Sequence, residues 1–413
     1  MTSNHLPHHN LTDEDQQEYN KIFKEFIFNI PHNMNPFSPQ LDEKKNSHIV
    51  EYHWRSPSNT IPSTCNTLYV CFNSPIPVNV IPNNVIILCF LCENKTGFTK
   101  GPDFNHPIHP GTIPMSVRYI YFINATYNKP LIAHALPPSA EYLFLSDCYN
   151  QAFRAGDLPP NLNILETGDE YNQPFDPLVI PKSLRSLFLG KGYNQPLEFG
   201  GLTSLTCLVY DEGSISELPI ISLPPNLEFL LLSDAFNHPI EAGMLPPKLK
   251  TLTFGDGFNQ PLAVGTLPPS LENINFGKVF DQPFLPNVLP HHLKSISFHQ
   301  FSYFSQTFEN IPSHVQTVEF GYTYNKPITS LPSHLKYIKF SEKYNHPIDG
   351  VLPQSLTHCY LGKSFKRPLV PGIFPPGLKV LILNGYPKKI PPGTVPANCN
   401  FQKNPKQGAC SVM

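Results

Sequence analysis

Cysteine and histidine are the residue types in this chain whose spacing could support metal or nucleophile chemistry. Cys89 and Cys92 form one C-x-x-C pair, but no second pair follows at the spacing of a zinc site. The pairs His8-His9 and His291-His292 are adjacent, which is not a metal-ligand spacing. We therefore predict no metal site, and we interpret Cys89 and Cys92 as small core residues of a strand.

Sequence motifs of the common enzyme classes are absent. The chain lacks G-x-x-x-x-G-K-[ST], G-x-G-x-x-G, H-E-x-x-H and G-x-S-x-G. Paired carboxylates such as Asp211-Glu212 fall in a loop-like part of the sequence, where solvation explains them. We predict that the protein is not an enzyme and that it uses no cofactor.

The residues Cys410-Ser411-Val412-Met413 have the form of a CaaX prenylation box, with Met413 of the type associated with farnesyl. This motif predicts lipidation at Cys410. One lipid chain gives only marginal membrane binding, and Lys403 and Lys406 would add attraction to an anionic surface. Peripheral membrane association is therefore expected. The alternative is an unmodified tail with an exposed thiol.

Composition points to a β architecture punctuated by proline. Proline supplies 48 of 413 residues, which leaves no room for uninterrupted helices of ordinary length. Thirty Phe and eighteen Tyr are enough for a large core, which argues against disorder. The 29 Lys and Arg against 31 Asp and Glu exclude nucleic-acid binding through overall charge. No apolar run has the length of a signal peptide or membrane span, so we expect a cytoplasmic protein with reduced thiols.

Internal repetition is the dominant pattern. An apolar residue followed by proline recurs from Ile113 to Val395 in steps of 20 to 23 residues, and Leu202 fills one step without its proline. Within one repeat, Leu271, Ile274 and Phe276 keep an apolar spacing that predicts a short strand with one face inward. A repeat of about 22 residues cannot bury an apolar face alone, so neighbouring repeats must stack and share a core.

A second element, an aromatic residue followed by Asn, any residue and Pro, keeps constant phase with the first. Two of its copies are Tyr171-Asn172-Gln173-Pro174 and Phe258-Asn259-Gln260-Pro261. Over about residues 100–397 these motifs resemble the FNIP repeat, a relative of the leucine-rich repeat that is abundant in social amoebae. The resemblance implies a β-rich solenoid, a leucine-rich-repeat-like right-handed coil of about 22-residue repeats with a parallel sheet. The family is known mainly as repeat arrays, so it implies no particular chemistry.

The recurring asparagine has two interpretations. One is a structural ladder in which each side-chain amide bonds the backbone of the next coil, and the other is a row of ligand groups. We favour the ladder, because an aromatic residue before the asparagine and a proline after it are typical of an inward turn. The asparagines concerned are Asn105, Asn128, Asn150, Asn172, Asn194, Asn237, Asn259, Asn325 and Asn345.

The outward residues of the predicted strands would form two columns across successive coils. The columns are apolar and aromatic in the first half of the array and polar after Thr251. We predict that this aromatic part binds a protein partner, although aromatic residues are also simply frequent in strands. The candidate binding residues are Tyr119, Tyr121, Tyr142, Phe144, Phe188 and Phe229.

These patterns divide the chain into four parts. Residues 1–47 are expected to form a polar, disordered arm, 48–98 degenerate capping coils, 99–397 the FNIP-like solenoid and 398–413 a polar tail with too little sequence for another coil. Residues 13–28 could form a short amphipathic helix, which either covers the first coil or docks onto a ubiquitin-ligase adaptor. The predicted function is a non-enzymatic protein-interaction scaffold with an unidentified partner. The alternative is a substrate-recognition subunit of a ubiquitin ligase.

Overall fold

A computed structural model describes residues 50–90, 104–123, 126–199, 201–216 and 219–403. Contacts divide the chain after Ile49, and all of the described residues belong to the unit Val50–Met413. In these residues the secondary structure consists of 19 strands, without a helix. Seventeen strands pair in one sheet, and β8 and β10 form a second sheet of two strands.

The strands are short and follow one another at the spacing of the sequence repeat. They are β1 (Glu51–Trp54), β2 (Thr67–Val70), β3 (Ile87–Phe90), β4 (Tyr119–Tyr121), β5 (Tyr142–Phe144), β6 (Ile164–Glu166), β7 (Ser186–Leu189), β8 (Leu197–Glu198), β9 (Cys207–Tyr210), β10 (Ile220–Ser222), β11 (Phe229–Leu231), β12 (Thr251–Thr253), β13 (Asn273–Phe276), β14 (Ser295–Phe298), β15 (Thr317–Glu319), β16 (Tyr337–Lys339), β17 (His358–Leu361), β18 (Val380–Leu383) and β19 (Asn400–Lys403).

Each coil contributes one strand to the main sheet, and each strand pairs in parallel with the strand of the next coil. Leu252 of β12 lies opposite Ile274 of β13, which lies opposite Ile296 of β14. These central residues have no exposed surface, because the other elements of each coil cover them. The predicted solenoid with a parallel sheet is therefore confirmed.

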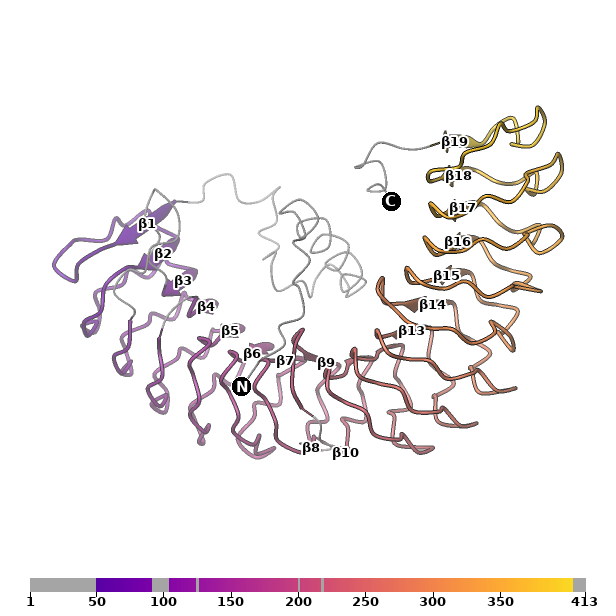
Figure 1. Cartoon of the computed structure of the whole chain (residues 1–413). Coiled ribbons are helices and arrows are strands. Elements are labelled where there is room, and N and C mark those ends of the chain that lie inside the picture. Colours follow the sequence, from indigo (N-terminus) through magenta and orange to yellow (C-terminus); the bar gives the residue numbers. More distant parts are fainter. Residues whose placement is uncertain (1–49, 91–103, 124–125, 200, 217–218, 404–413) are drawn as a thin grey trace, which may run out of the picture. The chain divides into compact units, whose positions relative to one another are not determined.

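The aromatic residue of the Asn-containing motif forms a second buried column. The ring centroids of Tyr149 and Tyr171 lie 6.2 Å apart, and those of Phe258 and Phe280 lie 6.1 Å apart, with nearly parallel planes. Paired strands repeat at about 4.8 Å, so the coils are wider apart at the rings than at the sheet. The stack consequently curves with its strands on the inner side (Figure 1).

The motif asparagines connect the same turns of successive coils. In successive coils that keep the motif, the side-chain oxygen of the asparagine accepts a hydrogen bond from the backbone N–H of the equivalent residue one coil later. These bonds are Asn128 to Asn105 (3.1 Å), Asn150 to Asn128 (3.0 Å), Asn172 to Asn150 (3.0 Å), Asn194 to Asn172 (2.9 Å), Asn259 to Asn237 (2.8 Å) and Asn345 to Asn325 (2.9 Å).

Glycine after the strand allows the backbones of two coils to approach closely. A Cβ atom on Gly277 would lie 2.1 Å from the carbonyl oxygen of Gly255, one coil earlier. A Cβ on Gly255 would meet the carbonyl oxygen of Ser233 at the same distance. A side chain at Gly255 or Gly277 would therefore force the two backbones apart.

The two ends of the stack differ from the middle. Strands β1, β2 and β3 within residues 48–98 pair in register and continue the sheet up to β4. At the other end, β19 pairs with β18, so the expectation that residues after 397 supply only a tail is wrong. The edge strand β18 presents a row of unpaired backbone N–H and C=O groups. A polar segment can pair with these groups as a further strand even if it contributes no side chain to the core. Phe401, at the central position of β19, is accordingly 36% exposed.

Replacing Asn259 by Ala should lower the free energy of unfolding by roughly 1–3 kcal/mol, because partly buried N–H groups of the next coil lose a partner. Its side-chain oxygen accepts bonds from the backbone N–H of Asp281 at 2.9 Å and from the Gln282 amide at 3.1 Å. Equilibrium unfolding in urea measures the change. Asn83→Ala, at an exposed turn asparagine, is the control. A loss no larger than that of the control would contradict the stabilising role of the ladder.

Candidate protein-binding face

The sheet has one face toward the core and one face away from it. The pairing register places Tyr119 opposite Tyr142 and Tyr121 opposite Phe144, and it continues the same two columns to β18. We call the surface formed by these two columns the sheet face. All six candidate binding residues lie in it.

Tyr142 differs from the prediction, since it was expected to be exposed and is only 5% exposed. Its ring lies 4.9 Å from that of Tyr121, and its hydroxyl donates a hydrogen bond of 2.7 Å to Glu166. Neighbouring long side chains on adjacent strands therefore cover it. Five candidates are partly exposed: Tyr119, Tyr121, Phe144, Phe188 and Phe229.

These five residues form three separate groups along the sheet face. Tyr119, Tyr121 and Phe144 lie on the neighbouring strands β4 and β5, whereas Phe188 and Phe229 follow on β7 and β11. Glu166 lies between Phe144 and Phe188 in the same column. The aromatic part of the face is thus interrupted by a carboxylate.

Glu166 is a residue of this face that the sequence reasoning overlooked. Burial raises its pKa to about 7, and the hydrogen bond from Tyr142 opposes this rise. The signal was present in the sequence, because Glu166 is the only acidic residue in the apolar half of the two columns.

The polar half of the sheet face is bonded within itself. The Asn273 amide donates to the Thr251 hydroxyl at 3.3 Å, and the Asn275 amide donates to the Thr253 hydroxyl at 2.9 Å. The Ser297 hydroxyl in turn donates to the Asn275 side-chain oxygen. Much of the hydrogen-bonding capacity of this half is consumed between coils.

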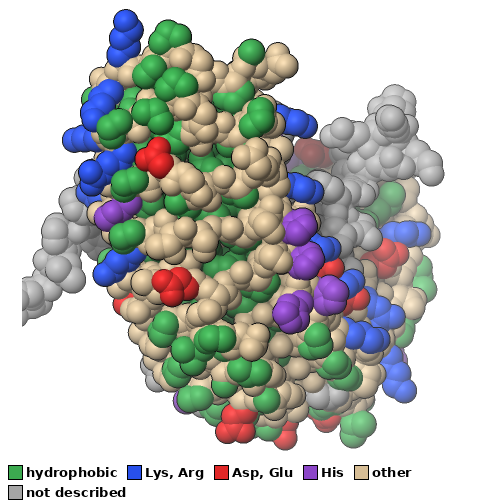
Figure 2. All heavy atoms as spheres, turned by 90° about the vertical axis from the view of Figure 1, so that its right-hand side faces the viewer, with side chains coloured by type: hydrophobic (Ala, Val, Ile, Leu, Met, Phe, Trp, Pro, Cys, Tyr) green, Lys and Arg blue, Asp and Glu red, His purple; other side chains and the backbone are tan. Residues whose placement is uncertain are grey.

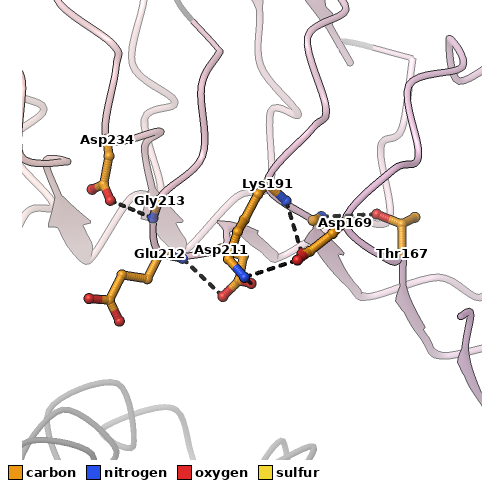
Figure 3. Close-up of polar contacts among 8 residues, drawn as sticks. Thr167, Asp169, Lys191, Asp211, Glu212, Gly213 and Asp234 are labelled. Carbon is orange, nitrogen blue, oxygen red and sulfur yellow. Dashed lines mark hydrogen bonds and ion pairs between the residues drawn. The ribbon is translucent and has the colours of Figure 1, made fainter. Parts of the chain in front are cut away.

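Charged residues that follow the strands also bond from coil to coil (Figure 3). The Lys191 ammonium lies 2.9 Å from a carboxylate oxygen of Asp169 and 3.8 Å from one of Asp211. The Asp234 carboxylate accepts a bond of 2.6 Å from the backbone N–H of Gly213. These groups satisfy one another and the backbone, an arrangement that suits coil cohesion better than acid–base catalysis.

In the described part of the chain, no group of three or more Cys, His, Asp or Glu residues is placed so that it could hold a metal ion. Cys89 is buried in β3, and this burial raises the pKa of its thiol to about 12. Cys92, Cys410 and the possible helix at residues 13–28 lie outside the described residues. No helix within the described ranges is long and apolar enough to cross a membrane.

One strand per coil in a continuous parallel sheet defines a leucine-rich-repeat-like solenoid, a fold typical of protein-interaction scaffolds. The model of the FNIP repeat matches residues 104–148, 149–192, 216–257, 258–301, 304–343 and 344–386, more than half of the chain. The chain therefore belongs to the FNIP-repeat family.

Solved structures with a similar fold are leucine-rich-repeat proteins. CroV588, described as a novel circular leucine-rich-repeat protein, is 26% identical with a TM-score of 0.58. The alignment covers 83% of this chain and 56% of CroV588, so the chain spans just over half the length of that protein. YopM of Yersinia pestis, a leucine-rich effector protein, is 19% identical over 94% of this chain and 99% of its own, with a TM-score of 0.49.

Glu166 should make stability depend on pH. Its pKa is about 7 in the fold against an ordinary value of 4.5. Between pH 4.5 and pH 7 the carboxyl is therefore protonated in the folded state and ionised in the unfolded state. The stability from this group is present below pH 4.5 and is lost as the pH rises through 7. Glu166→Gln, which stays neutral, should therefore gain roughly 1–3 kcal/mol relative to the wild type between pH 5 and pH 8.

Urea unfolding of both proteins at the two pH values measures this gain. Glu198→Gln, the same substitution at an exposed position, is the matched control. An equal effect of Glu166→Gln at pH 5 and pH 8 would show that this carboxyl has the same pKa in the folded and unfolded states, which would contradict the prediction.

Proposed function

We propose that this chain is a non-enzymatic scaffold that binds a protein partner through the aromatic half of its sheet face. One observation carries the proposal: five aromatic residues on strands β4 to β11 are partly exposed on the same face. They are Tyr119, Tyr121, Phe144, Phe188 and Phe229. Tyr142 would support this surface from its buried position.

Physical chemistry favours the aromatic half as the binding part of the face. Aromatic side chains bring a large contact area at a low entropic cost, and they dominate the binding energy of many protein interfaces. The polar half has already used many of its donors and acceptors between coils. A partner would therefore gain more free energy by covering the aromatic half.

Substitution of the two aromatic residues that flank Glu166 in its column tests the proposal. Phe144→Ser combined with Phe188→Ser should lower partner recovery from cell extract at least about tenfold, because each site loses a contact of more than 1 kcal/mol. The matched control is Ser295→Ala combined with Thr317→Ala, two positions of the same columns in the polar half. Circular dichroism and melting establish that both variants fold.

Equal recovery by wild type and the Phe144/Phe188 variant would contradict the aromatic site, as would an equal loss in the control. The ubiquitin-ligase alternative makes a different prediction for the same experiment. It requires Skp- or cullin-type proteins among the recovered partners, and their recovery should depend on residues 13–28.

We further propose that Cys410 carries a prenyl group and that the protein divides between the cytosol and the cytoplasmic face of membranes. The match of Cys410-Ser411-Val412-Met413 to the CaaX pattern supports this. Among the described residues, Cys65, Cys89, Cys207, Cys359 and Cys399 are thiols that form no disulfide, which fits a reducing compartment.

The mass of the C-terminal peptide from native cells tests the lipid proposal. We expect a farnesylated peptide that ends at Cys410, and Cys410→Ser should shift the protein from the membrane fraction to the soluble fraction. An unmodified peptide that still ends in Met413 would contradict the proposal without affecting the scaffold function.

A further inference from the structure

The turns that follow the strands carry a charge pattern that the net charge of −2 conceals. We call the surface formed by these turns, from β9 to β18, the turn edge. It comprises residues 211–214, 233–239, 255–261, 277–283, 299–305, 321–327, 341–347, 362–368 and 384–390. Its two ends have opposite charge, and its centre carries exposed apolar residues beside Lys278, Asp281 and Lys326.

The end of the turn edge after β16, β17 and β18 is basic. It contains six basic residues and one acidic residue, Glu342. The Glu342 carboxylate accepts bonds from the backbone N–H of Lys363 at 2.8 Å and the Asn384 amide at 3.3 Å. Figure 2 shows Lys and Arg side chains following one another along an edge of this part of the stack. All six basic side chains are exposed: Lys343, Lys363, Lys366, Arg367, Lys388 and Lys389.

The basic residues differ from those of earlier coils in their partners. Lys191, Lys250 and Lys278 each form an ion pair with an acidic residue of the preceding coil. The six basic residues at this end of the turn edge form no ion pair with any residue of the described part of the chain. Their charge is therefore available to an anionic surface.

The other end of the turn edge, after β9, β11 and β12, is acidic. Its four acidic residues face no basic residue within the same three turns. Asp211 and Glu212 are exposed, and Asp234 and Asp256 are partly exposed. The Lys278 ammonium pairs with Asp256, and the Lys191 ammonium lies 3.8 Å from a carboxylate oxygen of Asp211, so these two lysines offset part of the negative charge of this end.

Exposed apolar residues occupy the centre, between the two charged ends. Val279, Phe301, Tyr303 and Tyr322 lie in three successive turns after β13, β14 and β15, and Tyr303 is 63% exposed. Phe301 and Tyr303 lie in the turn after β14, where Tyr303 donates its backbone N–H to the carbonyl of Lys278 in the preceding coil. An apolar centre flanked by charges is the usual anatomy of a protein interface.

We propose that the turn edge binds the turn edge of a second copy of this chain, which gives a dimer with two-fold symmetry. The axis passes through the turn after β14, so that it brings the turn after β12 opposite that after β16 of the other copy. The turn after β11 then lies opposite that after β17, and the turn after β9 opposite that after β18. Because of the two-fold symmetry, each contact between an acidic and a basic turn occurs twice in the dimer. The exposed aromatic residues of the central turns of both copies meet at the axis.

A second copy fits this surface better than a polyanion does. A nucleic acid or an anionic membrane would be attracted by the basic end, but it would be repelled by the acidic end of the same edge. Self-association uses both ends and the apolar centre. The nine coils span roughly 40 Å at the repeat of paired strands, a length compatible with a specific interface.

A charge-swap experiment on the full-length chain without lipid tests the proposal by analytical ultracentrifugation at low salt. One variant carries Lys388→Glu and Lys389→Glu, and the other carries Asp211→Lys and Glu212→Lys. Each variant alone should dimerise at least about tenfold more weakly than the wild type, because like charges then face each other. An equimolar mixture should form the heterodimer, since one of its two contacts is native and the other has reversed charges.

Two controls separate the proposed contact from general effects of charge and hydrophobicity. Lys182→Glu combined with Lys248→Glu, two exposed positions outside the turn edge, should leave dimerisation unchanged. Tyr303→Ser should weaken the dimer, whereas Leu178→Ser, at an apolar residue that is 94% exposed elsewhere, should not. A monomeric wild type at tens of micromolar, or a swap variant whose loss the mixture does not rescue, would overturn the proposal. Neither outcome would affect partner binding by the sheet face.

Discussion

The repeated hydrogen bond between equivalent positions of successive coils is the constraint on which the rest of this structure depends. Strand backbones use it in the sheet, and the motif asparagines use it in the turns, where Asn172 binds the coil before it and the coil after it. Each coil must therefore copy the backbone path of its neighbour. Close contact at Gly277 and the wider spacing at the aromatic column follow from the same requirement, and together they produce the curvature.

Most of the fold could be predicted from the sequence, because a repeat of constant length fixes the pairing register once one strand is placed. The columns of the sheet face follow from this register. Burial of Tyr142 could not be predicted in this way, since it depends on how Tyr121 and Glu166 of adjacent coils fill the space around it. Strand β19 was missed because edge pairing uses the backbone and leaves no apolar pattern in the sequence.

The two surfaces of this solenoid suit different kinds of interaction. The sheet face presents partly exposed rings around the partly buried carboxyl of Glu166, whose raised pKa makes the charge of this face sensitive to pH near neutrality. The turn edge presents separated blocks of charge, whose attraction falls steeply with salt. One chain could therefore assemble through its turn edge while its sheet face remains available to a partner, as expected of a scaffold.

Residue-resolved hydrogen exchange of the native protein tests the central claim most directly. Coil-to-coil bonding predicts that the backbone N–H groups of Asn128, Asn150, Asn172 and Asn259 exchange as slowly as those of the neighbouring strands, because the preceding asparagine oxygen holds each of them. Exchange of these four amides at the rate of exposed turn amides, with the strands still protected, would contradict the account.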